Sequence, residues 1–123
     1  MNVVIWIIQV LLAAAFLMSG IMKLTVSKNR VKEKVGGWVE DFKVMEIKMI
    51  GLVEILGAIG LILPMVMNIF PFLTPIAASG LGVTMIVAAQ THLKRKESIF
   101  INIIFLIMAL LIVLGRLLLV PAA

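Results

Sequence analysis

Four long apolar stretches separated by short connections make up most of this 123-residue chain. They cover about residues 3–22, 47–65, 72–92 and 98–118. An α-helix needs roughly 20 mostly apolar residues to cross a bilayer, and each stretch is close to that length. The pattern predicts an all-α, membrane-embedded four-helix bundle formed by one domain, residues 1–123.

The connection at residues 27–46 differs from the spans, because its apolar side chains recur with helical spacing among lysines. These side chains are Val31, Val35, Trp38, Val39, Phe42 and Met45. Such a stripe is typical of an amphipathic helix at the headgroup level of a membrane. Ser27 is available as an N-cap, and Gly36-Gly37 is expected to break or bend the helix. We interpret the segment either as a solvated basic loop containing a bent helix or as a lid over the mouth of the bundle.

The composition supports a membrane protein and excludes several kinds of chemistry. Hydrophobic residues make up 63% of the chain, and the mean hydropathy of +1.25 is far above that of a soluble domain. Cysteine is absent, which excludes disulfides, thiolate metal sites and iron–sulfur clusters. His92 is the only histidine, which leaves too few ligands for a protein-only zinc site or a bis-histidine haem. We expect no metal site, and any redox role would need a borrowed cofactor.

Ten of the eleven Lys and Arg residues lie in or beside the first and third connections. The positive-inside rule places those connections in the cytoplasm, so both termini are expected outside the cell (cytoplasmic) membrane. The cations are expected to contact membrane lipids, and no nucleic-acid binding is expected. Arg116 is expected to anchor the outer interface, and Gln9 to hydrogen-bond a neighbouring helix.

Glu54 is a carboxylate near the middle of the second predicted span. An acid inside a span costs roughly 2.5–3.5 kcal/mol unless it is paired, protonated or hydrated, so it marks a candidate site. Three alternatives remain open: a structural acid hydrogen-bonded to Thr84 or Gln90, a ligand or proton site, or a lipid-facing acid. Helical rise puts Glu54 about 10–15 Å deeper than Lys23 or His92. A direct ion pair would need an inward-reaching lysine or shifted span boundaries.

Polar side chains from all four spans fall in the middle or the cytoplasmic half of the predicted bundle with Glu54. We expect them to form a ligand-binding or proton site, although Lys23 and His92 also suit the headgroup level. They are Ser19, Lys23, Gln90, Thr91, His92 and Asn102. The sequence shows no nucleophile–base arrangement of hydrolases and no phosphate-binding glycine loop, so no catalytic residue is predicted.

Small residues recur in the second and third spans. Such residues allow membrane helices to approach closely. Those predicted to pack helices together are Gly51, Gly57, Gly60, Gly80, Thr84 and Ala88.

Short motifs from all four spans occur in the order typical of a known family. The first is Phe-Leu-Met-Ser-Gly-Ile-Met-Lys-Leu at residues 16–24. The second joins Gly-Leu-Val-Glu at 51–54 to Gly-Ala-Ile-Gly-Leu-Ile-Leu-Pro at 57–64. The third is Leu-Thr-Pro-Ile-Ala-Ala-Ser-Gly-Leu at 73–81, followed by Ala88, Thr91, His92, Arg95 and Glu97, and the fourth ends in Gly115-Arg116. Through these motifs, nearly the whole chain resembles the DoxX-like family of small four-span membrane proteins.

The resemblance implies an architecture and a range of roles. The wider family includes membrane subunits linked to thiosulfate–quinone oxidoreduction, partners in oxidative-stress membrane complexes, and eukaryotic assembly factors for receptors. It singles out Ser19, Lys23, Glu54, Thr91 and His92 as the polar positions of its motifs. Because this chain lacks cysteine, no thiol-based mechanism carries over.

Two hypotheses follow. The first is a small subunit that binds a lipid-soluble ligand, a quinone or a lipid, in a polar pocket around Glu54 and serves an oxidoreductase or stress-related complex. The second is a non-catalytic scaffold or assembly factor that packs against another protein's membrane helices. Association with a second copy of the chain, as a homo-oligomer, is a further open alternative. Neither requires turnover by this chain alone, and a transporter is a weaker third because no inverted repeat is evident.

Overall fold

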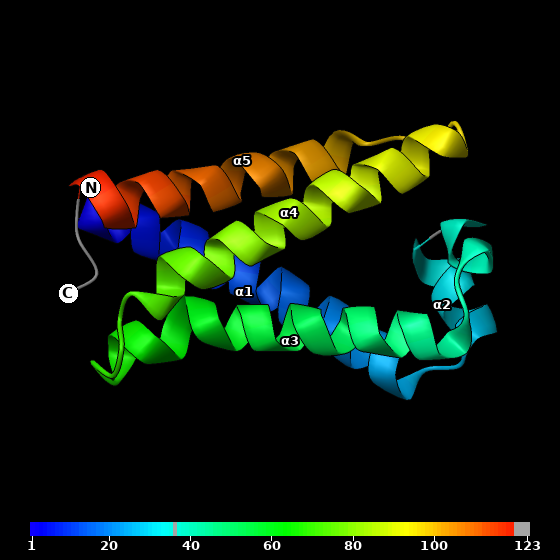
Figure 1. Cartoon of the computed structure of the whole chain (residues 1–123), viewed down its shortest axis with the longest axis horizontal. Coiled ribbons are helices and arrows are strands. Elements are labelled where there is room, and N and C mark those ends of the chain that lie inside the picture. The colour runs from blue at the N-terminus through cyan, green and yellow to red at the C-terminus, as the bar shows by residue number, and fades with distance from the viewer. Residues whose placement is uncertain (36, 120–123) are drawn as a thin grey trace.

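The computed structural model describes residues 1–35 and 37–119 and is built from helices, with no strand in those two ranges. Four helices are long and apolar enough to cross a membrane, which confirms the predicted all-α bundle (Figure 1). They are α1 (Asn2–Thr25), α3 (Val44–Val66), α4 (Leu73–Lys94) and α5 (Phe100–Leu114), which continues into the π-helical turn η2 (Gly115–Leu119).

The predicted amphipathic connection consists of helix α2 (Lys28–Val35) and the 3-10 helix η1 (Gly37–Asp41). Val31 and Val39 are fully buried and form a small cluster with Ile47 at the start of α3. Met45 was expected in the same apolar stripe, but it is 67% exposed because the chain has already turned into α3 there. The expected break at Gly36 and the side chain of Val35 lie outside the described residues.

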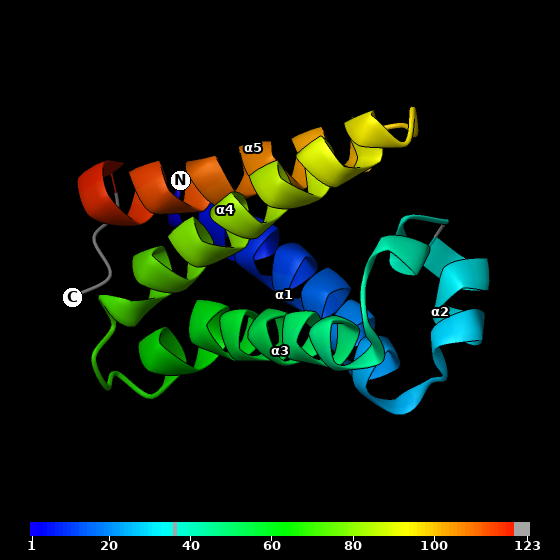
Figure 2. The same ribbon diagram turned by 45° about the vertical axis from the view of Figure 1, so that its right-hand side comes forward.

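The four long helices form two pairs, α1 with α3 and α4 with α5, which diverge toward α2 (Figures 1 and 2). We call the end that carries α2 the open end, and the end that carries Met1 and Leu119 the closed end. The main apolar core lies in the middle and the closed half of the bundle. It contains Leu12, Phe16, Ala58, Leu61, Ala78, Leu81, Ala109 and Ile112.

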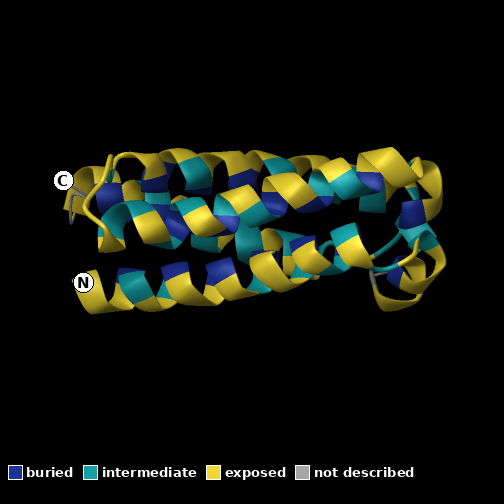
Figure 3. Cartoon of the chain, turned by 90° about the horizontal axis from the view of Figure 1, so that it is seen from below, coloured by how far each residue is buried: buried dark blue, intermediate teal, exposed yellow. Residues whose placement is uncertain are grey.

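The outer faces of all four long helices carry exposed, mostly apolar residues (Figure 3). Only 22–33% of the residues in the apolar window of each helix are buried inside the bundle. In water such a surface would be unfavourable, whereas lipid tails cover it without cost. The chain is therefore a multi-pass membrane protein.

The closest approach of α1 and α3 is made by two glycines, Gly20 and Gly51. A Cβ on Gly20 would lie 2.5 Å from the Gly51 carbonyl oxygen, and a Cβ on Gly51 would lie 2.8 Å from the Gly20 carbonyl oxygen. A Cβ on Gly57 would lie 2.6 Å from Leu81 of α4, and a Cβ on Gly60 would lie 2.7 Å from Ala77 of α4. Small residues thus set the helix spacing, as is common where lipid supplies no hydrophobic drive.

Gly80 behaves differently from these glycines. It was expected on a packing face, but it is exposed and a Cβ there would meet no atom within 4 Å. Gly82, two residues along α4, faces Leu106 and Ala109 of α5 instead. Within the described residues, Gly80 therefore does not pack against another helix. The rotation of α4 places Gly82 against α5 instead.

A buried polar cluster joins three helices at the closed end. Gln9 donates a hydrogen bond to the carbonyl oxygen of Leu61 at 2.6 Å and accepts one from Nε of Arg116 at 2.6 Å. Arg116 also donates to Asn2 Oδ1 at 2.7 Å and lies over the Trp6 ring. The expectation that Arg116 anchors the outer interface is corrected, because its side chain points into the bundle and is 2% exposed.

Candidate functional site

A cavity of about 730 Å³ lies between the two helix pairs in the open half of the bundle. All four long helices and the α2–η1 connection contribute to its wall. Among the predicted site residues, those that line it are Ser19, Lys23, Glu54, Thr91, His92 and Asn102. Gln90 is exposed and does not line it, because Gln90 and Thr91 point about 100° apart around the helix axis.

Lys23 and Glu54 form a buried ion pair in the cavity wall. Lys23 Nζ lies 2.5 Å from Glu54 Oε1, and the two side chains are 9% and 3% exposed. α1 continues to Thr25, so Lys23 lies inside the helix rather than beyond its end. Both conditions expected for a direct ion pair are therefore met: the helix extends past residue 22, and the lysine side chain reaches inward. The partner of Glu54 is Lys23, and not Thr84 or Gln90 as expected.

The glycine contact between α1 and α3 explains how this ion pair is positioned. Lys23 follows Gly20 by three residues and Glu54 follows Gly51 by three residues, so both charged side chains lie close to the helix contact face. Since the two helices run in opposite directions, helical rise separates the two backbones by about 9 Å along the axis. An extended lysine side chain spans much of that separation while its apolar stem packs against Gly51.

Trp38 of η1 contacts both basic groups of the cavity wall. Its ring centroid lies 5.4 Å from Lys23 Nζ and 5.8 Å from the His92 ring centroid. Phe42 packs edge-on against the same indole at 5.5 Å. The spacing of apolar residues predicts Trp38 only as part of an apolar stripe, and nothing in its local sequence indicates a contact with Lys23.

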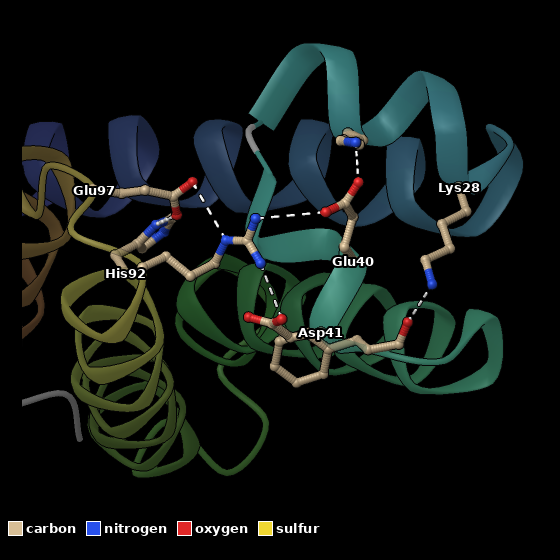
Figure 4. A network of polar contacts seen from close by, with 8 residues as sticks. Lys28, Glu40, Asp41, His92 and Glu97 are labelled. Carbon is tan, nitrogen blue, oxygen red and sulfur yellow. Dashed lines mark hydrogen bonds and ion pairs between the residues drawn. The ribbon is translucent and has the colours of Figure 1, made fainter.

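His92 stands at the end of α4 with its ring against the cavity. Its Nδ1 lies 2.9 Å from Glu97 Oε1, and the side chain is 15% exposed (Figure 4). Hydrogen bonding to a carboxylate favours the tautomer with the proton on Nδ1. The other ring nitrogen, Nε2, makes no hydrogen bond within the described residues and is available to a ligand.

Three further side chains line the cavity and do not bond to Glu54. Thr84 and Thr91 donate hydrogen bonds to backbone carbonyl oxygens one turn earlier in α4, those of Gly80 and Val87. Asn102 of α5 approaches the sulfur of Met85 at 3.8 Å. Thr84 and Ala88, expected to pack helices together, both line the cavity, and Ala88 also packs against the core.

An ion-pair network around Arg95 lies next to His92 at the end of α4 (Figure 4). The Arg95 guanidinium lies 3.0 Å from Asp41, 3.5 Å from Glu40 and 3.8 Å from Glu97. Glu40 also pairs with Lys32 of α2. A hydrogen bond from Lys32, and its positive charge, hold the pKa of Glu40 below the ordinary value of 4.5, and the charge of Arg95 adds to the effect. The network links η1 to the turn after α4.

Four membrane-spanning helices around a mostly apolar cavity with a few polar groups define the class: a small multi-pass membrane protein with a candidate site inside its bundle. Within that class, a DoxX-like family model matches residues 7–115, nearly the whole length, and the chain belongs to the DoxX-like family. No curated protein and no solved structure gives a significant match to the chain. The family assignment identifies the chain as a small DoxX-like membrane protein.

Proposed function

We propose that the protein binds a lipid-soluble ligand, a quinone or a lipid, in the cavity around Glu54. The observation that carries the proposal is the buried Lys23–Glu54 pair in the wall of a cavity of about 730 Å³. Ligand sites are usually 300–1,000 Å³, mostly apolar, with a few convergent polar groups. This cavity has that size and that composition.

The walls of the cavity support access from the bilayer. Met49 and Val53 on α3 and Val83 and Val87 on α4 line the cavity, yet each is at least 50% exposed. A side chain that faces both the cavity and the outside marks a place where the two communicate. A ligand with a polar head at Lys23 and an apolar tail between α3 and α4 would therefore have both parts in matching surroundings.

The donors in the cavity suit the carbonyl groups of a quinone. Lys23 Nζ carries three hydrogens, of which Glu54 accepts one, so two remain for a ligand. At His92, the imidazolium would donate from Nε2 to a carbonyl, while the neutral ring would accept from a quinol hydroxyl. The ion pair with Glu54 orients Lys23. These roles are binding and proton handling, and electron transfer would belong to a partner.

The cellular setting of the proposal follows from charge and family. The concentration of Lys and Arg at the open end supports a cytoplasmic orientation of that end in the cell membrane. Membership in the DoxX-like family supports a role as a subunit of an oxidoreductase or stress-related complex. Under this proposal the chain supplies a bound, positioned quinone or lipid to that complex.

The two tryptophans allow a direct binding test, since Trp38 lines the cavity and Trp6 lies near the closed end. Trp6→Phe leaves Trp38 as the reporter, and decylubiquinone is titrated into the purified protein in detergent. We expect saturable quenching of Trp38 emission. In Trp38→Phe, the remaining Trp6 should show only the weak, linear quenching caused by quinone dissolved in the micelle.

Two substitutions in the Trp6→Phe background test the polar contacts. His92→Ala should weaken decylubiquinone binding about tenfold, because one good hydrogen bond is worth about 1.5 kcal/mol. Gln90→Ala, two residues away and outside the cavity, should leave it unchanged. Equal linear quenching of both tryptophans, or unchanged binding in His92→Ala, would contradict quinone binding at this site. Native mass spectrometry of the same sample separates a co-purified lipid from a quinone by mass.

A non-catalytic scaffold is the second candidate function, and the exposed Gly80 favours it. A Cβ at Gly80 would meet nothing, and Ile76 and Val83 beside it are 59% and 60% exposed. A partner helix, or a second copy of the chain, would find close backbone access there. Under this alternative, Gly80→Leu abolishes recovery of a complex and leaves quinone binding unaffected.

A further inference from the structure

The open end of the cavity is covered by residues 37–42, which we call the lid segment. Trp38 and Phe42 of this segment form part of the cavity wall. Trp38 contacts Lys23 on α1 and His92 on α4, so it bridges the gap between the two helix pairs. The lid segment therefore stands between the polar groups of the cavity and the medium beyond the open end.

One side of the lid segment is fixed by apolar contacts. Val39 is fully buried and packs with Val31 and Ile47, and Met22 of α1 and Val26 at the end of α1 pack against this cluster. Lys28 also donates a hydrogen bond to the carbonyl oxygen of Phe42 at 2.5 Å. Burial of apolar side chains is favourable and is not weakened by salt, so this side is a stable attachment to the α1–α3 pair.

The other side is held by the contact between the Trp38 and His92 rings and by exposed ion pairs. Arg95, which follows α4, contacts Asp41 and Glu40, and all three side chains are between 30% and 51% exposed. Exposed ion pairs contribute little to stability and are weakened by salt. The attachment to the α4–α5 pair is therefore much weaker than the attachment to the α1–α3 pair, and it is the side that releases first.

We propose that the lid segment seals the cavity from water at the open end, with the apolar cluster as its hinge and Arg95 as its latch. When the latch is closed, the remaining route into the cavity is the one between α3 and α4, which faces the bilayer. When the latch opens, Trp38 moves away from His92 and water reaches the Lys23–Glu54 pair. The lid selects a ligand that arrives through the membrane.

Acrylamide quenching of Trp38 in the Trp6→Phe protein, without added ligand, tests the latch. Acrylamide is neutral and dissolved in water, so it reports exposure of the indole to the aqueous phase. We expect Arg95→Gln to raise the quenching constant about threefold. Lys94→Gln, which removes a neighbouring cation that makes no ion pair in the described ranges, should leave it unchanged. Raising the salt concentration should increase quenching in the parent protein and have little effect in Arg95→Gln.

A second variant removes the other half of the latch. Asp41→Asn should also raise quenching, and adding it to Arg95→Gln should give no further rise, since both changes break the same contact. Trp6 emission in the Trp38→Phe, Arg95→Gln protein checks that the closed end stays folded. If the closed end of that variant does not stay folded, quenching in Asp41→Asn alone tests the latch. Unchanged quenching in both latch variants, or an equal rise in Lys94→Gln, would overturn the lid. Because no ligand is added, failure of quinone binding does not affect this result.

Discussion

The two ends of the bundle each bury a cation, but the two cations have different partners and different surroundings. Lys23 at the open end and Arg116 at the closed end are both less than 10% exposed. Each lies 5.4 Å from the ring of a tryptophan, Trp38 or Trp6. Lys23 pairs with a carboxylate beside a cavity, whereas Arg116 donates to two neutral amide oxygens away from it.

The difference lies in the acceptors and in the space beside them. Gln9 binds Arg116 with one end of its amide and the Leu61 carbonyl with the other, so the closed-end cluster joins α1, α3 and α5. The Lys23–Glu54 ion pair joins α1 and α3, and both residues line the cavity. Burial of an ion alone therefore does not mark a ligand site. Under the proposed function, a buried ion marks a ligand site only where it lies beside a cavity and keeps hydrogen-bond donors for a ligand.

Breaking the open-end pair should have the largest effect. Glu54→Gln leaves Lys23 buried without a counter-charge, and such changes cost about 3–5 kcal/mol. The free energy of unfolding, measured by denaturant titration in detergent, should fall by that amount. The double variant Lys23→Met, Glu54→Leu removes both charges and should recover most of the loss, while decylubiquinone no longer quenches Trp38 saturably.

Two outcomes of that experiment would contradict the difference proposed between the two ends. If Glu54→Gln were as stable as the parent protein, Lys23 would not depend on Glu54 for its burial. If the double variant still bound decylubiquinone with unchanged affinity, the pair would be purely structural, like the cluster at the closed end.

Disrupting the closed end should have a smaller effect on stability and none on binding. Gln9→Leu leaves Arg116 and the Leu61 carbonyl each without one hydrogen bond, which costs about 1–3 kcal/mol for a buried group. Thermal unfolding should detect this loss, while decylubiquinone quenching of Trp38 stays the same. Val10→Leu, at the neighbouring exposed position, is the control and should change neither. Weaker quinone binding in Gln9→Leu would show that the two ends are coupled.

The fold could be predicted from the sequence because membrane helices must satisfy their own backbone groups, so apolar length alone identifies them. The four predicted spans correspond to α1, α3, α4 and the α5–η2 helix, with ends displaced by a few residues. The displacement matters at Lys23, which a span ending at residue 22 leaves outside and α1 includes. Polar side chains at helix ends carry little hydropathy information, so these boundaries are the least predictable feature.

The rotation of each helix about its axis could not be predicted. Apolar residues surround these helices on every side, so the sequence does not show that Thr91 faces the cavity while Gln90 faces outward. The pairing of Lys23 with Glu54 depends on the contact between Gly20 and Gly51, which lie 31 residues apart. Arg116 at the end of a span resembles an interfacial anchor until the fold brings Gln9 beside it. These facts depend on tertiary packing between distant segments.

Acidification should loosen the open end while leaving the closed end intact, and this is the smallest effect expected. The groups that face Glu40 are Lys32 from α2 and Arg95 from the turn after α4. Because they lower the pKa of Glu40 below 4.5, its contribution to the latch is complete above that pH and is lost as the pH falls through the lowered pKa. Acrylamide quenching of Trp38 should rise in that range, by less than in Arg95→Gln, because Glu40 is only one of the two carboxylates of the lid segment that Arg95 contacts. Lys32→Gln should move the midpoint to higher pH, whereas Arg30→Gln, an exposed cation on the same helix, should not. An identical midpoint in Lys32→Gln would show that Glu40 does not hold the lid segment. Asp41 would then be the remaining carboxylate of the lid segment that contacts Arg95.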